Sequence, residues 1–169
     1  MSCRFSGIES IVQSQDADKS PVVHKLKEWD GEAVSEVLGF RGEITVVVPR
    51  EHLKRIAEYL ATEPSLRFSF LSDITPVDRF PIEPRFEVNY HLVSIDRRDR
   101  LRLKVKLAGN DPVIPSVTGV WPTANWHERE SYDLFGIRFQ GHPDLRRILM
   151  PDDWEGYPLR KDYPTEGYR

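Results

Sequence analysis

The sequence predicts an α+β fold: a two-layer α/β domain with a mostly antiparallel sheet, followed by a helix and an extended C-terminal arm. Three observations predict it. Apolar and polar residues alternate over residues 86–107, which is typical of a hairpin with one buried face. Apolar residues recur at helical spacing after residue 50 and again over residues 121–135. Prolines and glycines interrupt residues 140–169 too often for a long helix or strand.

These patterns divide the chain into three parts. Residues 1–20 are polar and aperiodic, and we expect a mobile leader there. Residues 21–136 are expected to form the α+β domain, which includes the predicted helix at residues 121–135. Residues 137–169 are expected to form an extended arm that binds a partner.

The domain is expected to begin with a short helix over residues 21–29. The preceding serine would be its N-cap and the proline would occupy its first position, where a missing N–H costs nothing. An Asp-Gly pair then ends this helix. Residues 33–38 fit either a helix or a strand, and we interpret them as a strand that turns at residues 41–42.

A strand, a helix and a second strand are expected next. Residues 44–48 are rich in β-branched side chains, which is typical of a buried strand. Pro49 would open a helix whose apolar side chains recur at helical spacing: Leu53, Ile56, Ala57 and Leu60. The second strand is predicted from the alternating residues Leu66, Phe68 and Phe70. It is expected to end in a turn-rich run over residues 73–84.

The clearest strands are the two halves of the hairpin at residues 86–107. A two-residue loop at residues 97–98 or a four-residue loop at residues 96–99 would pair Ile95 with Arg100, and both registers put Leu92 opposite Leu103. The outer face would carry a basic row of three side chains, namely Arg102, Lys104 and Lys106. We expect this row to be solvated and to protect a sheet edge from aggregation.

A loop stiffened by Pro112 and Pro115 leads into the helix at residues 121–135. Its second residue, a proline, suits the first turn, and Gly136 suits the C′ position. A helical projection places one set of side chains together on an apolar face: Trp121, Ala124, Glu128, Ser131, Tyr132 and Phe135. The other face carries Trp126, Arg129, Glu130 and Asp133.

Glu128 is a carboxylate on the apolar face of this helix. A buried carboxylate needs a cation or several donors, or it takes up a proton. We expect its partner to be one of the downstream arginines, Arg146, Arg147 and Arg160. Arg129 and Asp133 are four residues apart and can pair on the polar face. Glu128→Gln is therefore expected to be more harmful than Glu130→Gln or Asp133→Asn.

The arm combines irregular backbone with aromatic side chains. Residues 140–169 contain four prolines and three glycines, yet they also contain Trp154, Tyr157, Tyr163 and Tyr168. Aromatic side chains are uncommon in disordered tails, so these need a surface. The arm lies either on its own domain or on another protein, and the sequence favours the second.

Composition excludes several classes of function. The net charge of −3 does not indicate nucleic-acid binding. One cysteine cannot hold an iron–sulfur cluster or a structural zinc, and the sequence has no glycine-rich phosphate loop. No apolar run approaches the ~20 residues of a membrane span. We therefore predict no catalytic, cofactor-binding or metal-ligating residue in this chain.

The motifs of the helix and arm resemble a known family. Glu-Arg-Glu-x-x-Asp-Leu-Phe begins at Glu128, a histidine follows at His142, Leu-Arg-Arg-Ile-Leu begins at Leu145, and Pro-Leu-Arg-Lys-Asp-Tyr begins at Pro158. Together they are similar to the 30-kDa-type subunit of respiratory NADH:quinone oxidoreductase, which in bacteria is the C subunit of complex I. The resemblance is specific over residues 121–164 and looser over the preceding sheet.

This resemblance implies a subunit of the peripheral arm at the cytoplasmic face of the cell membrane, attached to the membrane only through the complex. FMN, iron–sulfur clusters, NADH and quinone would be bound by other subunits. It also implies packing against the quinone-site subunit (the 49-kDa-type, or D, subunit) and other peripheral-arm subunits. Eleven residues are expected at the partner interface or in positioning the arm: Glu128, Arg129, Glu130, Asp133, His142, Arg146, Arg147, Arg160, Lys161, Asp162 and Tyr163.

Two alternatives remain at this stage. The chain could be the equivalent subunit of a ferredoxin-dependent or hydrogenase-type relative of complex I, because the motifs do not distinguish these. It could also be a stand-alone acid–base enzyme that uses Glu128, Glu130 and Asp133. Helical phase separates Glu128 from the other two carboxylates by about 160°, which argues against a shared cleft.

Overall fold

The computed structural model describes residues 17–166, and it confirms the predicted α+β class. Its helices are α2 (Pro21–Trp29), α3 (Leu53–Thr62) and α4 (Ala124–Phe135), with 3-10 turns η1 (Gly31–Ala33) and η2 (Arg50–His52). Its strands are β1 (Glu36–Phe40), β2 (Glu43–Val47), β3 (Phe70–Asp78), β4 (Phe86–Ser94), β5 (Asp99–Leu107), β6 (Val113–Pro115) and β7 (Arg138–Gln140).

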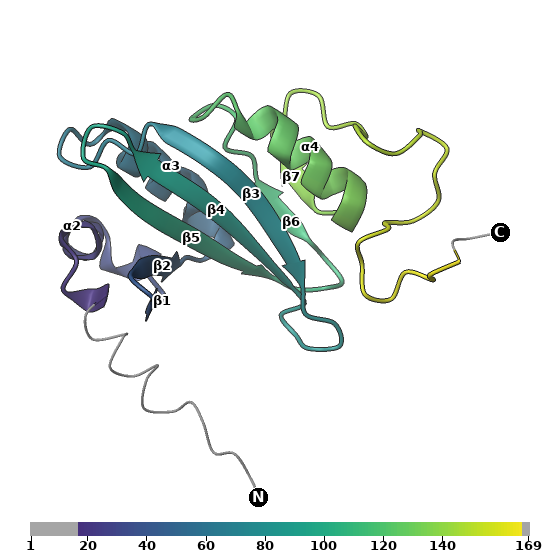
Figure 1. Ribbon diagram of the computed structural model, residues 1–169, viewed down its shortest axis with the longest axis horizontal. Coiled ribbons are helices and arrows are strands. Elements are labelled where there is room, and N and C mark those ends of the chain that lie inside the picture. The colour runs from purple at the N-terminus through teal and green to yellow at the C-terminus, as the bar shows by residue number, and fades with distance from the viewer. Residues whose placement is uncertain (1–16, 167–169) are drawn as a thin grey trace, which may run out of the picture.

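The main sheet has the strand order β1-β2-β5-β4-β3. Only the β2–β5 pair is parallel, and the other pairs are antiparallel. Figure 1 shows α3 behind this sheet and α4 beyond its β3 edge. The four apolar side chains predicted for the helix after Pro49 are all buried against the sheet. Burying one Leu or Ile side chain stabilises a fold by about 1.5–3 kcal/mol, so this face forms the core.

Two N-terminal predictions are confirmed. Helix α2 begins at Pro21 after Ser20, although the Ser20 side chain makes no capping hydrogen bond. The ambiguous stretch forms η1 and then strand β1, which turns into β2 at residues 41–42. Most of the expected leader, residues 1–16, lies outside the described residues. Ala17, the first described residue, is buried in the core.

The hairpin has the predicted buried face but a different register. Tyr90 pairs with Leu103, and Leu92 pairs with Leu101 rather than with Leu103. The strands are therefore shifted by two residues relative to the prediction, and Ser94 pairs with Asp99. Since side chains alternate with period two, a shift of two leaves the same residues facing the core. The apolar pattern could not distinguish these registers.

The predictions for the second strand and for the basic row are wrong in part. Leu66 and Phe68 are buried but precede β3, which continues through Pro76. A proline is tolerated there because β3 is an edge strand. Strand β5, in contrast, lies between β2 and β4 and protects no edge. Its basic side chains instead form ion pairs with acidic residues of the same sheet: Arg102 with Glu43 of β2, Lys104 with Glu87 of β4 and Lys106 with Glu36 of β1.

Helix α4 begins at Ala124, three residues later than predicted. Trp121, Pro122 and Thr123 form a turn instead, with the Ala124 N–H donating to the Trp121 carbonyl at 3.0 Å. The Trp121 indole N–H donates to the Phe68 carbonyl at 2.9 Å, which fixes the start of α4 against the main domain. Gly136 has a φ of 72° at the end of α4, as predicted for a C-terminal cap.

Candidate partner interface

Most of the predicted site residues lie where the C-terminal segment, residues 141–166, follows α4; Glu128 is the exception. This segment comes after β7, which pairs in parallel with β6, a small sheet that the sequence analysis missed. Figure 1 shows the segment as the yellow trace that runs past the end of α4 towards the far end of the main sheet. Side chains of α4 and of the β3–β4 loop hold it there.

Asp133 of α4 is the first anchor, and its side chain is fully buried. One carboxylate oxygen accepts the backbone N–H groups of residues 148, 149 and 150 at 3.0, 2.8 and 2.8 Å. The other oxygen accepts from the Arg147 guanidinium at 2.7 Å. Burial alone would raise the pKa of Asp133, but these N–H donors and Arg147 hold it below its usual value. Asp133 is therefore an ionised carboxylate around which the chain turns.

Arg147 connects this anchor to the next part of the segment. Its guanidinium also donates to the Asp133 carbonyl at 3.1 Å and to the Trp154 and Gly156 carbonyls at 3.0 and 3.1 Å. It lies 5.5 Å from the centre of the Tyr157 ring. Charge-assisted hydrogen bonds are roughly twice as strong as neutral ones. One side chain thus ties α4 to two separate turns of the segment.

Arg129 and His142 fix the beginning of the segment. The Arg129 guanidinium donates to the carbonyls of residues 146 and 147 at 3.2 and 3.1 Å. His142 Nδ1 accepts the Asp144 N–H at 3.0 Å, so Nε2 carries the proton and donates to the Asn125 carbonyl at 3.2 Å. The Arg146 side chain is exposed and pairs with Asp144 at 2.9 Å.

A second anchor binds the other end of the segment. Asp78, at the end of β3, accepts the Lys161 backbone N–H at 2.9 Å. Arg85, at the start of β4, donates to Asp162 at 2.9 and 2.6 Å and to Asp78 at 2.9 and 2.8 Å. Burial would raise the pKa of Asp78, but Arg85 and the N–H donors lower it to about 2. Asp78 and Arg85 were not predicted from the sequence, because no local pattern links them to residues 83 and 77 positions away.

Arg160 binds the C-terminal end of α4, between the two anchors. Its Nε donates to the Phe135 carbonyl at 2.6 Å, and its guanidinium lies 4.5 Å from the centre of the Tyr157 ring. A Cβ on Gly136 would lie 2.5 Å from Tyr157 and 2.6 Å from the Arg160 guanidinium. Only glycine fits this position, both for space and for its left-handed backbone.

The prediction that Glu128 pairs with an arginine is wrong. Glu128 is fully buried, but its carboxyl group accepts the Val117 N–H at 2.7 Å and faces the Ser116 hydroxyl. Its second oxygen has no hydrogen-bond partner among the described residues. Burial raises the pKa of Glu128 to about 7. The Arg129–Asp133 pair also does not form, since both side chains bind residues of the segment.

The polar face of α4 was therefore predicted only in part. Asp133 is buried under the segment and Arg129 is nearly so, whereas Glu130 is exposed. Glu128 and Asp133 are equally buried, but only Asp133 pairs with an arginine, so the ion pair on which the expected order was based belongs to Asp133. A helical projection shows only the helix's own residues, and the chain that covers this face comes from elsewhere.

Other site residues remain accessible beside these anchors. Glu130 lines a cavity of about 250 Å³ between β3 and α4, together with Leu159 of the segment. Lys161 is exposed, although its backbone N–H is bound to Asp78. Tyr163 is half-buried, and its N–H donates to the Arg160 carbonyl at 3.1 Å. The candidate interface therefore combines buried anchors with exposed side chains.

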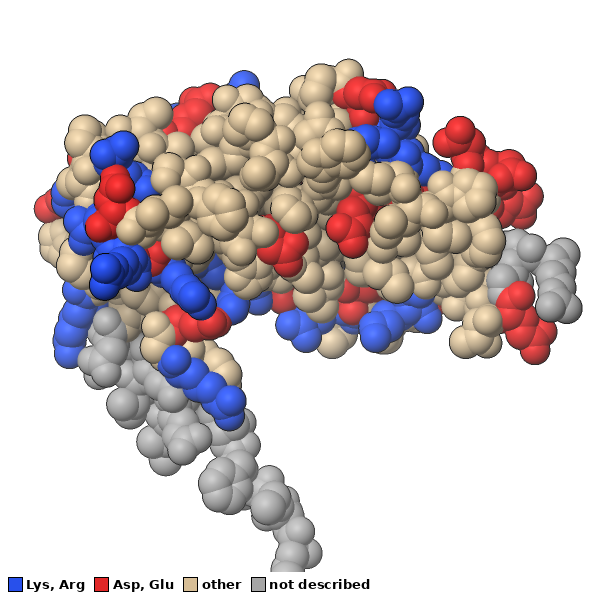
Figure 2. Space-filling model, turned by 45° about the horizontal axis from the view of Figure 1, so that its top comes forward, with Lys and Arg blue, Asp and Glu red and all other residues tan. Residues whose placement is uncertain are grey.

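Large apolar side chains are exposed around this site. They lie on α4 and the C-terminal segment: Trp126 (61% exposed), Leu149 (61%), Trp154 (39%) and Leu159 (51%). Figure 2 shows a broad area of neutral residues, broken by a few acidic side chains, over the centre and right of the molecule, where α4 and the segment lie. Clustered exposed apolar groups are typical of a protein–protein interface.

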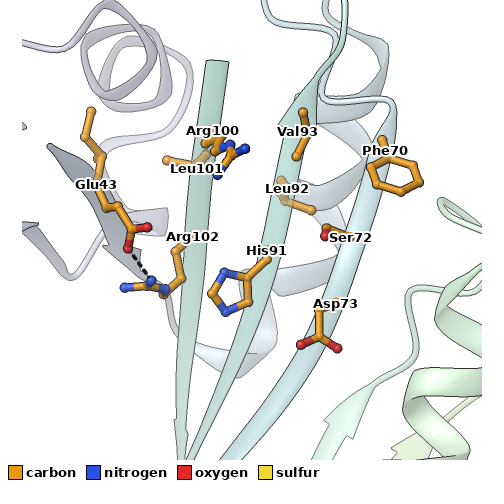
Figure 3. Close-up of a pocket in the computed structure, with 11 residues that line it drawn as sticks. Glu43, Phe70, Ser72, Asp73, His91, Leu92, Val93, Arg100, Leu101 and Arg102 are labelled. Atoms are coloured by element: carbon orange, nitrogen blue, oxygen red, sulfur yellow. Dashed lines mark hydrogen bonds and ion pairs between the residues drawn. The ribbon is translucent and has the colours of Figure 1, made fainter. Parts of the chain in front are cut away.

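A second depression lies on the open face of the main sheet, and no residue of the segment lines it. It has a volume of about 490 Å³ and is lined by β2, β3, β4 and β5. His91 lies between Arg102 and Asp73 in this depression (Figure 3). Burial, and secondly the charge of Arg102, lowers the pKa of His91, so the imidazole is neutral at pH 7. Arg102 is itself paired with Glu43 at 2.5 Å.

The three carboxylates of the acid–base hypothesis do not share a cleft. Glu128 faces residues 116–117, Asp133 is bound to residues 147–150, and Glu130 points outwards near β3. Within residues 17–166, no group of three or more His, Cys, Asp or Glu side chains is arranged to hold a metal ion. No helix in this part of the chain is long and apolar enough to cross a membrane.

Comparison with known proteins decides the family. The model of the respiratory-chain NADH dehydrogenase 30 Kd subunit matches residues 46–169. The chain belongs to this family. As a member it is a subunit of the NADH-quinone oxidoreductase complex, which confirms the resemblance seen in the motifs.

Curated relatives and solved structures agree with this assignment. The C subunit of NADH-quinone oxidoreductase from Roseiflexus sp. (strain RS-1) is 49% identical, over 87% of this chain and 84% of its own length. The same subunit of Geotalea uraniireducens is 49% identical, over 89% and 91%. The trypsin-resistant fragment of Nqo5 has a TM-score of 0.63 and 36% identity, over 73% of this chain and 98% of that chain. A chain of the archaeal membrane-bound sulfane sulfur reductase has a TM-score of 0.72 and 26% identity, over 85% and 84%.

Proposed function

We propose that the chain is a cofactor-free structural subunit of the peripheral arm, and that α4 and the C-terminal segment bind the quinone-site subunit. The observation that carries this proposal is the set of four exposed apolar side chains on one bound segment and one helix. Exposed large apolar side chains that recur along one helix and the segment bound to it are typical of a protein–protein interface. The quinone-site subunit is the partner that the motif resemblance implies.

The two anchors explain how an irregular segment can serve as an interface. Asp133 and Arg147 fix one end of the segment, while Asp78 and Arg85 fix the other. Ordering a flexible segment during binding would cost about 0.5–1.5 kcal/mol for each immobilised long side chain. Because the segment is already ordered on its own domain, most of this cost is absent when the partner binds.

The redox chemistry then belongs to the rest of the complex. FMN, iron–sulfur clusters, NADH and quinone are bound by other subunits, and this chain reaches the cytoplasmic face of the membrane only through them. The single cysteine supports this division of labour, since an iron–sulfur cluster needs about four ligands, mostly thiolates.

The test replaces apolar side chains of the proposed interface in the intact chain. Trp154→Ser with Leu159→Ser should weaken co-purification of the quinone-site subunit at least tenfold, because interface centres rely on a few buried apolar anchors. Ile95→Ser is the matched control, since Ile95 is 64% exposed on the β4–β5 loop. Normal assembly of the double variant, measured as subunit stoichiometry in purified complex, would sink the proposal.

A second candidate function is the equivalent subunit of a related membrane complex. The archaeal sulfane sulfur reductase favours it, because its chain shares this fold over most of its length. The identity of 26% is nevertheless well below the 49% shared with subunits of NADH-quinone oxidoreductase. The electron donor of the purified complex, NADH or a ferredoxin, distinguishes the two.

A further inference from the structure

The loop over residues 79–85, between β3 and β4, carries two large apolar side chains that no interaction described above explains. Phe80 is 49% exposed and Ile82 is 66% exposed. Figure 1 shows that this loop projects beyond the end of the sheet, on the side where the C-terminal segment ends. Neither residue belongs to the motifs that carry the family resemblance, the first of which begins at Glu128.

The loop is held in one shape by its own hydrogen bonds. The Arg79 N–H donates to the Arg85 carbonyl at 2.7 Å, and the Ile82 N–H donates to the Arg79 carbonyl at 2.9 Å. The Glu83 carboxylate accepts the N–H groups of Arg85 and Gly109 at 3.0 and 3.1 Å. The exposed apolar side chains are therefore displayed on an ordered backbone, as at a preformed binding surface.

The loop and the C-terminal segment are joined through Arg85. Its guanidinium binds Asp162 of the segment and Asp78 at the loop's base. The same group lies 4.9 Å from the centre of the Phe80 ring and 5.0 Å from the centre of the Phe86 ring. Since the two carboxylates fix the guanidinium, the stacking also fixes Phe80. The loop tip and the segment thus form one continuous surface.

We propose that the 79–85 loop is part of the same interface and inserts Phe80 and Ile82 into an apolar depression of the quinone-site subunit. This inference rests on the proposed function and extends it to a part of the chain outside the helix and segment. The occupant is the same partner because Arg85 makes the loop continuous with the segment. The β4–β5 loop, in contrast, lies at the opposite end of β4.

Photo-cross-linking in the assembled complex tests the inference. The photo-reactive amino acid p-benzoylphenylalanine is introduced in place of Ile82, Leu159 or Ile95, and the cross-linked subunit is identified by mass spectrometry. Ile82 and Leu159 should both yield the quinone-site subunit, and Ile95 should not. A cross-link from Leu159 alone would overturn the inference and leave the proposed function intact. No cross-link to that subunit from either position would overturn both.

A substitution gives an independent measurement. Phe80→Ser with Ile82→Ser should reduce co-purification of the quinone-site subunit roughly tenfold, with nearly unchanged thermal unfolding of the isolated chain, because neither side chain belongs to the buried core. Arg85→Lys keeps the charge but loses the forked geometry, and it should weaken assembly while loosening the segment. Wild-type assembly of the double variant would contradict the inference even if Arg85→Lys failed to assemble.

Discussion

Asp133→Asn should release the C-terminal segment from α4. The substitution keeps the size of the side chain but leaves one acceptor oxygen where the structure needs two. If that oxygen accepts the N–H groups of residues 148–150, the amide group faces the donors of Arg147. Removing one partner of a buried ion pair costs about 3–5 kcal/mol.

The lower end of this range applies here. The Arg147 side chain is 15% exposed and keeps its bonds to three carbonyl groups. A loss of about 3 kcal/mol corresponds to a change of roughly a hundredfold in the equilibrium between attached and detached segment. The core residues all precede the segment's anchored part, so global unfolding should change much less.

Hydrogen exchange measures this equilibrium directly. The backbone amides of residues 148–150 should exchange roughly a hundredfold faster in Asp133→Asn than in the natural protein. Glu130→Gln is the control, since Glu130 is exposed on the same helix and surface substitutions change stability by only about 0.5 kcal/mol. Equal exchange rates in Asp133→Asn and the natural protein would refute the role of Asp133 as an anchor.

Three further predictions follow from single residues. The pKa of Glu128 rises on folding from its usual value near 4.5 to about 7, so the folded state binds the extra proton and loses stability as pH rises between these values. Relative to Glu128→Gln, the natural chain should lose roughly 3 kcal/mol of unfolding free energy between pH 4.5 and 7.5, measured by urea denaturation. The same dependence of unfolding free energy on pH in both proteins would contradict this. Gly136→Ala should loosen the segment more than Gly141→Ala, since both have positive φ but only the first meets Tyr157; equal proteolysis of the two variants would be evidence against this packing. The purified chain should contain no flavin, iron or zinc by absorbance and elemental analysis, and about one metal per chain would refute a cofactor-free subunit.

Alternation and helical spacing were enough to predict most of the domain. The spacing of apolar residues along the chain was enough to identify the buried face of the hairpin and the four core residues after Pro49. The register of the hairpin could not be predicted in this way, because a shift of two residues leaves the same side chains on the buried face. Strand β3 was missed beyond residue 72 because Pro76 is compatible with a strand only at a sheet edge, and edge position is a property of the whole sheet.

The site was predicted less well, for a related reason. Most motif residues do contact the segment, yet the arginine partner predicted for Glu128 belongs to Asp133. Burial by a distant segment decides which carboxylate is ionised, and a single helix contains no information about that segment. Asp78 and Arg85 could not be found at all, because they meet residues 161–162 only in the folded chain.

The most direct test of the account is whether the chain enters its complex when it ends at residue 151. The truncation removes Trp154, Leu159 and the contacts of the second anchor but no residue of the buried core. The truncated chain should fold, as judged by circular dichroism and cooperative thermal unfolding, yet be absent from the purified complex, with loss of NADH:quinone turnover in membranes. A truncated chain that is present at normal stoichiometry, with normal turnover, would contradict the proposed interface.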